Sequence, residues 1–341
     1  MRAAGCEPIA DIEELSVMGL AEVLRKYPQL RRLRNRISDY YISTRPDVFV
    51  GIDVPDFVLS IEARLHAKSI STVHYVAPQV WAWRQSRAKR IAQHLDTLLA
   101  LFPFEAQFYE GYGLNTVFVG HPIADQIPLA RDSVARKADL GLEQSKRYIA
   151  LMPGSRRQEW FRHVDLFLRT AQRISNEVGQ VAFVVGAINS AAKDYISQRV
   201  AEICPGLEVL IFTGRSHEIL GASDVALVAS GTVTMEGLFT KTPMVVAYKV
   251  APATYFLMRR LVKVPFIAMP NILMGRALLP EFLQNEATEE RLASSVMGWL
   301  RNERAVREFE ATCTNFHLTL RQGAASSAAE EILRLAGELV E

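Results

Sequence analysis

Short apolar runs alternate with longer segments of helical length from about residue 45 onward. In the first half, the apolar runs predict strands at 47–52, 71–76, 97–101 and 116–119, and the segments between them predict helices at 57–68, 84–94 and 104–112. Strands that alternate with helical crossovers are typical of a parallel sheet covered on both faces. This series ends at Gly120-His121-Pro122, and the polar segment 123–145, which carries Pro128, is predicted to be a linker.

A second series of the same kind follows the linker. Its predicted strands are 148–152, 181–185, 207–211, 224–228 and 243–247, and its helices lie near 159–175, 191–203, 218–221 and 234–240. Two Rossmann-like α/β domains are therefore predicted, over 1–122 and 146–320, with sheets that face each other across a cleft lined by the carboxyl ends of strands. Beyond residue 289 the pattern is helical only, and a C-terminal helix over 321–341 can pack back on the N-terminal domain.

Composition and charge narrow the class of protein. The 341 residues include 39 Lys and Arg against 37 Asp and Glu, and this net charge of +2 argues against a nucleic-acid binder, which would be strongly basic. Three widely separated cysteines, Cys6, Cys204 and Cys313, predict neither a disulfide framework nor a zinc site. No uninterrupted apolar stretch reaches the roughly 18 residues of a spanning helix, and the N-terminus lacks the layout of a secretory signal. A cytoplasmic protein is expected.

One segment near the N-terminus has the pattern of a membrane-surface helix. Between Met18 and Arg36 the chain carries six basic residues interleaved with apolar ones, and no acid follows Glu22 until Asp39. A helix of this kind can lie in the interface of an anionic membrane. A helix that buries its apolar face in the core and solvates its basic face has the same pattern, so both interpretations stay open.

Two glycine turns follow predicted strands of the second domain. At Gly154-Ser155-Arg156, backbone N–H groups at a helix start favour an anion such as a diphosphate, and the arginine adds a forked charged contact. After Ser230-Gly231-Thr232, Glu236 lies one turn into a helix, where a carboxylate can accept hydrogen bonds from ribose hydroxyls. Each turn alone also suits an ordinary capped helix. Two such turns, at strands that can be neighbours, predict one ligand held at two points.

The first domain carries a candidate base and an aromatic loop. Asp53 ends a buried strand, so its carboxylate can act as a general base, although an aspartate in this position is more often structural. The loop from His74 to Arg84 contains Trp81 and Trp83, whose faces suit sugar rings or acyl chains. The alternative is a loop packed beneath a helix. Two further candidates for hydrogen bonds to a ligand between the domains are His121 and Asn271.

Several short sequence motifs, taken in order, resemble those of the lipid-A-disaccharide synthase family over essentially all of the chain. The most specific is the Trp-Ala-Trp-Arg loop, whereas the Pro-Gly-Ser-Arg and Ser-Gly-Thr turns are shared among nucleotide-sugar enzymes. The matching motifs are Gly51-Ile-Asp53-Val-Pro-Asp-Phe, His74-Tyr-Val-Ala-Pro-Gln-Val-Trp-Ala-Trp-Arg84, Leu101-Phe-Pro-Phe-Glu105, Gly120-His-Pro122, Leu151-Met-Pro-Gly-Ser-Arg156, Ala229-Ser-Gly-Thr232 and Pro270-Asn271.

This resemblance implies an inverting GT-B glycosyltransferase without a metal or other cofactor. It implies transfer of 2,3-diacylglucosamine from UDP to the 6-hydroxyl of 2,3-diacylglucosamine 1-phosphate, with Asp53 as the base and 146–320 as the donor domain. The sequence of that domain contains no Asp-x-Asp pair that could hold a metal, which agrees with the metal-free mechanism that the resemblance implies. Acylated substrates imply peripheral association with the anionic inner membrane, and a homodimer stays open.

The first residues depart from the family pattern. Members usually begin with a strand and a Gly-Glu-x-Ser-Gly-Asp loop, whereas this chain opens at Met1-Arg-Ala-Ala-Gly-Cys-Glu7. The N-terminal domain is therefore expected to lack its first strand-helix unit. Two alternatives to the synthase are another UDP-sugar enzyme of this architecture, such as an epimerase or a transferase acting on a lipid-linked precursor, and an inactive membrane-binding protein.

Overall fold

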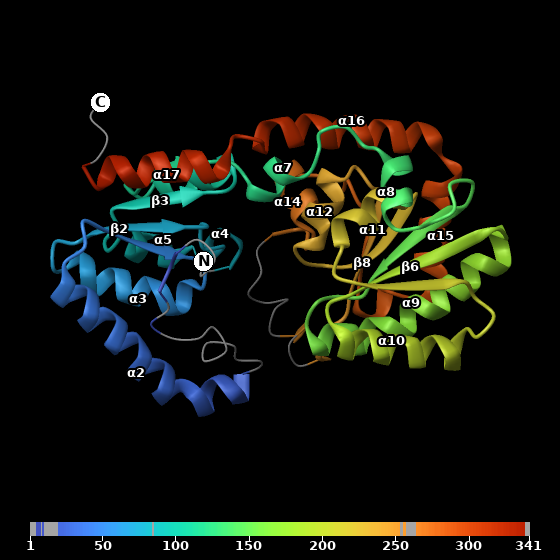
Figure 1. Cartoon of the computed structure of the whole chain (residues 1–341), viewed down its shortest axis with the longest axis horizontal. Coiled ribbons are helices and arrows are strands. Elements are labelled where there is room, and N and C mark those ends of the chain that lie inside the picture. The colour runs from blue at the N-terminus through green and yellow to red at the C-terminus, as the bar shows by residue number, and fades with distance from the viewer. Residues whose placement is uncertain are drawn as a thin grey trace. The chain divides into compact units, whose positions relative to one another are not determined.

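The structure is a computed structural model that describes residues 5–7, 9, 20–83, 85–252, 255–256 and 264–337; the side chains of residues 20–26 and of Trp83 lie outside the described part. The chain divides into two compact units, the first comprising Met1–His121 and Gly323–Glu341 and the second Pro122–Gln322. Each unit contains one parallel sheet with helices on both faces (Figure 1). The α/β class with two parallel-sheet domains, predicted from the alternating pattern, is confirmed.

The first unit contains a four-stranded sheet in the order β1-β2-β3-β4, with every neighbouring pair parallel. All four strands were predicted to within one residue at each end. Its elements are α2 (Leu20–Thr44), β1 (Val48–Ile52), α3 (Pro55–His66), β2 (Ser71–Tyr75), α4 (Val80–Trp83), α5 (Ser86–Ala92), β3 (Thr97–Ala100), α6 (Pro103–Glu110), β4 (Asn115–Phe118) and α17 (Ala324–Leu335).

Neighbouring residues of β3 show how both faces of this sheet become buried. Side chains alternate along a strand, so Leu98 and Leu99 point to opposite faces, and both are fully buried. Leu98 packs in a cluster with Ile91 of α5, whereas Leu99 packs in one with Ala328 of α17. The C-terminal helix thus covers one face of the N-terminal sheet, although more than 200 residues separate them in the sequence.

Helix α2 packs against α3 through its later turns. Leu33 is buried, and Ile37 and Tyr41 are partly buried, the latter two against the cluster that contains Ile61 and Leu65 of α3. Arg64 of α3 also donates a hydrogen bond to the carboxylate of Asp39 in α2. Within the basic segment, Leu33 thus packs in the core, whereas Arg31 and Arg32 are exposed. The side chains of residues 18–26 lie outside the described part.

The second unit contains a six-stranded parallel sheet in the order β10-β9-β8-β5-β6-β7. This is the Rossmann order. The first and fourth strands of the unit, β5 and β8, lie side by side in the centre, and the later strands are added outward on either side of this pair. Its elements are α7 (Pro122–Gln126), α8 (Ser133–Asp139), β5 (Arg147–Met152), α9 (Arg157–Val178), β6 (Val181–Ala187), α10 (Ser190–Ile203), β7 (Val209–Thr213), α11 (Ser216–Ala222), β8 (Val225–Ala229), α12 (Val233–Phe239), β9 (Met244–Tyr248), α14 (Met269–Met274), β10 (Glu281–Leu283), the 3-10 helix η2 (Gln284–Glu286), α15 (Glu289–Arg301) and α16 (Glu303–Leu320).

Two segments differ from their predicted structure. Residues 123–145, predicted as a linker, form most of α7 and all of α8 within the second unit, because Ala124, Ile127 and Leu140 are buried there. Residues 281–283, which were assigned to no element, form the short edge strand β10 beside β9. A three-residue edge strand makes few ladder bonds, and its half-buried side chains give little periodic signal.

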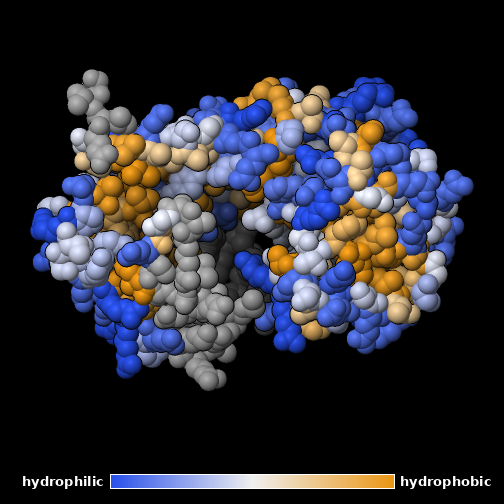
Figure 2. Space-filling model, in the orientation of Figure 1, coloured by the Kyte–Doolittle hydropathy of each residue, from blue (hydrophilic) through white to orange (hydrophobic). Residues whose placement is uncertain are grey.

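None of the helices in the described ranges has the length and apolar character needed to cross a bilayer. Figure 2 shows apolar areas lying among hydrophilic ones on the visible face of each unit.

Candidate active site

The first glycine turn lies at the carboxyl end of β5. The strand ends at Met152, Gly154 adopts a φ of +116°, and α9 begins at Arg157 with Arg156 as its N-cap residue. A Cβ added at Gly154 would lie 2.6 Å from the Cβ of Glu159, so only glycine fits this turn without displacing that side chain. The sequence places a tight turn and a long helix start at the edge of the sheet where Rossmann-like folds bind ligands.

The N–H groups of this turn already have an acceptor within the chain. The Ser155 and Arg156 backbone N–H groups each donate to Oε2 of Glu159, both at 3.1 Å. The Arg156 guanidinium donates to Oε1 of the same carboxylate at 3.0 Å, yet its side chain remains 76% exposed. The donors of the predicted anion site therefore converge on one acceptor, and in this structure that acceptor is the Glu159 carboxylate.

The second glycine turn lies beside the first. Strands β5 and β8 are paired, with Met152 opposite Val228, so their carboxyl ends adjoin at the switch point of the sheet. Ser230 follows β8 and donates from Oγ to the Ile267 carbonyl at 3.1 Å, and Thr232 occupies the N-cap position of α12 without a capping bond from its side chain. The two turns were predicted to hold one ligand at two points, and the pairing of their strands brings them together.

Glu236 lies in the first turn of α12, close to His217 of α11. His217 Nε2 is 3.5 Å from Glu236 Oε2, and this buried oxygen has no hydrogen-bond partner among the residues that the structure describes. A ribose hydroxyl is a suitable donor for such a carboxylate oxygen. His217 was not singled out from the sequence, because a histidine one residue into a helix has no distinctive pattern.

Asn271, predicted to contact the ligand, is fully buried and bonded within the chain. Its Nδ2 donates to the Leu279 carbonyl at 2.8 Å and to Glu281 Oε1 at 2.7 Å, and its Oδ1 accepts from the Leu279 N–H. Glu281 in turn accepts from the backbone N–H groups of Ile267 and Ala268. Because both amide hydrogens are used, Asn271 braces the segment after β9 in this structure rather than offering a free contact.

His163 fixes the backbone of the first turn of α9. This buried ring donates from Nδ1 to the Glu159 carbonyl at 2.8 Å, and its Nε2 accepts from the Lys249 N–H at 2.9 Å, just beyond β9. Burial lowers the pKa of His163, which keeps the ring neutral and able to accept that bond. The α9 start is therefore tied to the residue that follows β9, independently of any ligand.

Asp53, the candidate base, lies at the carboxyl end of β1. Its N–H donates to the Tyr75 carbonyl at 2.9 Å, and both Asp53 and Val54 have positive φ values, 51° and 47°, before α3 begins at Pro55. This left-handed pair turns the chain sharply and leaves the Asp53 side chain exposed. An exposed carboxylate at a strand end is available to a substrate hydroxyl.

His74 does not line a surface, in contrast to its predicted place in a ligand-binding loop. It is fully buried on β2, and its Nδ1 lies 2.8 Å from Oε1 of Glu62 of α3, also buried. Its register partner is Gly51, where an added Cβ would lie 2.1 Å from the same Glu62 oxygen. His74 and Glu62 therefore form a buried polar contact, and Gly51, two residues before Asp53, leaves room for the Glu62 carboxylate.

Trp81 of α4 is also mostly buried, and it packs against aromatic residues that follow β3. Its ring meets Phe104 edge to face, and Phe104 stacks on Phe102, whose ring lies 5.5 Å from that of His121. Trp81 Nε1 donates to Glu105 Oε1 at 3.2 Å. The packed-loop interpretation thus describes Trp81; the side chain of Trp83 and the whole of Arg84 lie outside the described residues.

Glu105, the last residue of the Leu101–Glu105 motif, is a buried acid for which no role was predicted. Burial raises its pKa to about 8, although the hydrogen bond from Trp81 opposes that shift. Its Oε2 has no hydrogen-bond partner among the described residues. The carboxyl group is therefore neutral near pH 7 in the folded protein.

We expect the stability of the wild type to fall as pH rises through about 8, and Glu105→Gln to abolish this fall. The folded-state pKa lies above the ordinary value of 4.5, so the stabilising contribution is fully present below about pH 4.5 and is lost as pH rises through about 8. Glutamine keeps an acceptor for Trp81 and cannot ionise. Urea unfolding of both proteins between pH 4 and 9.5 measures the effect, and parallel pH profiles would contradict it.

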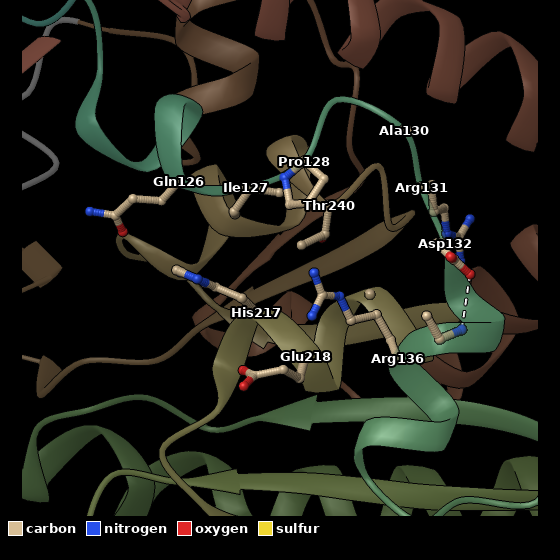
Figure 3. A pocket seen from close by; sticks show the side chains of 12 residues that line it. Gln126, Ile127, Pro128, Ala130, Arg131, Asp132, Arg136, His217, Glu218 and Thr240 are labelled. Carbon is tan, nitrogen blue, oxygen red and sulfur yellow. Dashed lines mark hydrogen bonds between the residues drawn. The ribbon is translucent and has the colours of Figure 1, made fainter. Parts of the chain in front are cut away.

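A pocket of about 520 Å³ opens in the second unit beside His217 (Figure 3). Figure 3 shows the guanidinium group of Arg136 extending from α8 into this pocket, while the Gln126 side chain points away from it. None of its residues was predicted as a site residue. The lining residues are Gln126, Ile127, Pro128, Ala130, Arg131, Asp132, Ala135, Arg136, His217, Glu218, Gly221 and Thr240.

Two parallel-sheet α/β units, one in Rossmann order with paired glycine turns at its switch point, define the GT-B class. Solved structures agree at the level of fold. A UDP-N-acetylglucosamine 2-epimerase described as putative, from Listeria monocytogenes, matches with a TM-score of 0.62 at 14% identity, over 97% of this chain and 83% of that one. A glycosyltransferase from Rickettsia africae matches with a TM-score of 0.54 at 12% identity, over 90% and 81%.

Sequence comparison identifies the family. The family model described as lipid-A-disaccharide synthetase matches residues 1–335. The lipid-A-disaccharide synthase of Pseudomonas paraeruginosa is 46% identical over 98% of this chain and 88% of its own length, and that of Alkalilimnicola ehrlichii is 44% identical over 99% and 89%. The chain belongs to the lipid-A-disaccharide synthase family.

Proposed function

We propose that this protein transfers 2,3-diacylglucosamine from UDP to the 6-hydroxyl of 2,3-diacylglucosamine 1-phosphate. The products are the β-1,6-linked lipid A disaccharide 1-phosphate and UDP. The observation that carries the proposal is the family match over residues 1–335, supported by relatives that are 46% identical and named for this synthase activity. The likeness to epimerases, at 14% identity, extends to the fold alone.

The site chemistry is consistent with an inverting displacement. Asp53 accepts the proton of the acceptor hydroxyl while that oxygen bonds to the anomeric carbon of the donor. The bond from this carbon to the diphosphate oxygen breaks with inversion, and Arg156 and the N–H groups of its turn stabilise the leaving UDP. Glu236 binds the ribose. In this mechanism the protein's own donors neutralise the diphosphate, so no metal is required.

Product analysis tests the proposal. Purified protein is incubated with UDP-2,3-diacylglucosamine and 2,3-diacylglucosamine 1-phosphate in detergent, with and without EDTA, and lipids are analysed by mass spectrometry. The expected product is the tetra-acylated disaccharide 1-phosphate in equal yield under both conditions. A protein that binds UDP yet forms no disaccharide would contradict the proposed reaction, and loss of product with EDTA would contradict its metal independence.

We also propose that the basic part of α2 docks the protein on the anionic inner surface of the cytoplasmic membrane. Arg31 and Arg32 are exposed, and Arg34 is partly so, on the turns that precede and surround buried Leu33. Both proposed substrates carry acyl chains that dissolve poorly in water. A peripheral location would bring the enzyme to these lipids, and the packing of later α2 turns on α3 would anchor the docking segment to the first unit.

Reversal of charge at Arg31, Arg32 and Arg34 should weaken binding to vesicles that contain anionic lipid. Each basic residue near such a surface contributes about 1 kcal/mol, so a loss on the order of 100-fold is expected at low salt. Co-sedimentation of wild type and the Arg-to-Glu triple variant at low and high salt measures it. The control is the same reversal at Arg301, Arg304 and Arg307 in the second unit. Equal binding by all three proteins, or binding indifferent to salt, would favour the purely packed helix.

A further inference from the structure

Glu159 occupies the donors that the proposed function assigns to the diphosphate. Two backbone N–H groups and one guanidinium arm of the Gly154–Arg156 turn end on its carboxylate, at 3.0 to 3.1 Å. A backbone N–H has one hydrogen and makes one strong hydrogen bond at a time. A diphosphate oxygen and the Glu159 carboxylate therefore compete for the same groups, and as like charges they also repel.

The chain is built to let Glu159 reach this position. Gly154 has no Cβ, and a Cβ there would lie 2.8 Å from Oε2 of Glu159 as well as against its Cβ. The backbone of Glu159 is held separately, because its carbonyl accepts from His163. The carboxylate can therefore leave the turn by rotation of its own side chain, without unwinding α9, and its side chain is 16% exposed at a helix start that borders solvent.

We propose that Glu159 is a positioning residue that competes with the UDP diphosphate and thereby promotes release of UDP after transfer. The inference rests on the proposed function, since it concerns the donor site of that reaction. While UDP is bound, the turn donates to phosphate oxygens and Glu159 faces solvent. When UDP leaves, the carboxylate returns to the same N–H groups, so the empty turn never exposes unpaired donors and the product is more easily displaced.

The test is the affinity for UDP of Glu159→Gln. An amide oxygen still accepts one N–H of the helix start but carries no charge, so UDP should bind about 10-fold more tightly, with a correspondingly lower inhibition constant for UDP in the transferase assay. Isothermal titration with UDP at low and high salt measures both the gain and its expected decline as salt screens the charge. A residue that merely caps the helix would not tighten UDP binding when changed.

Matched controls separate this role from others. Glu177→Gln makes the same charge change in the last turn of the same helix and should leave UDP affinity unchanged. Glu159→Ala is the second variant; some stability should be lost with the cap, and tighter UDP binding should persist. Unchanged or weaker UDP binding by both Glu159 variants, in proteins that melt cooperatively, would overturn the inference. Failure of the wild type to bind UDP at all would instead overturn the proposed function.

Discussion

Asp53→Asn is expected to lower the turnover of glycosyl transfer by about 100- to 10,000-fold, the usual effect of removing a general base. The substitution should leave the fold intact for a specific reason. Residue 53 has a φ of +51°, and asparagine tolerates the left-handed region at least as well as aspartate. The backbone bond from residue 53 to the Tyr75 carbonyl is also unaffected by the change.

The neighbouring aspartate supplies the control. Asp56 is exposed in the first turn of α3 and pairs with Arg87 at 2.9 Å, so Asp56→Asn removes a similar charge three residues away. Its turnover should remain within a few-fold of wild type, because an exposed ion pair contributes little. Steady-state kinetics with both substrates, together with thermal melting, compares the three proteins. Near-normal turnover in Asp53→Asn would remove Asp53 from the role of base.

The sequence predicts the sheets and the place of the donor turns well, because both depend on local pattern. Buried parallel strands are continuous apolar runs, and the glycine turns at Gly154 and Gly231 interrupt them at the same edge. That β5 and β8 are neighbours follows from the Rossmann order, which a series of β-α units favours but does not specify. The short edge strand β10 and the helices within 123–145 have too few periodic positions to be recognised.

Side-chain roles were harder to predict, because motif residues can be buried beneath a site as well as exposed in it. His74 and Asn271 were expected to touch ligands, yet both are fully buried. His74 bonds to Glu62, and Asn271 bonds to Glu281. Those glutamates come from elements 10 to 12 residues away, and no spacing rule in the sequence points to them. Glu159 was assigned no role from the sequence. It lies three positions from Arg156, and its carboxylate accepts hydrogen bonds from the donors that were predicted to bind an anionic ligand.

Arg156→Ala should lower kcat by about 100- to 1,000-fold, comparable to the loss of one preorganised donor to a developing negative charge. The guanidinium is exposed and bonded to a single carboxylate. It can therefore bind the leaving diphosphate without leaving a buried group unpaired. The backbone N–H of residue 156 still donates to the Glu159 carboxylate, so the turn should persist. UDP affinity, measured by titration, should fall along with kcat.

Two further variants define what Arg156 contributes. Arg156→Lys should recover little activity, because an ammonium group lacks the planar fork that spans two phosphate oxygens. Arg157→Ala is the matched control, since the Arg157 guanidinium lies 5.3 Å from the centre of the Phe161 ring, where it packs as a cation on an aromatic face. If Arg156→Ala and Arg157→Ala bind UDP and turn over alike, the diphosphate does not rest on Arg156. A deficit in Arg156→Ala that lysine fails to restore requires a bidentate contact, because charge alone would have been replaced.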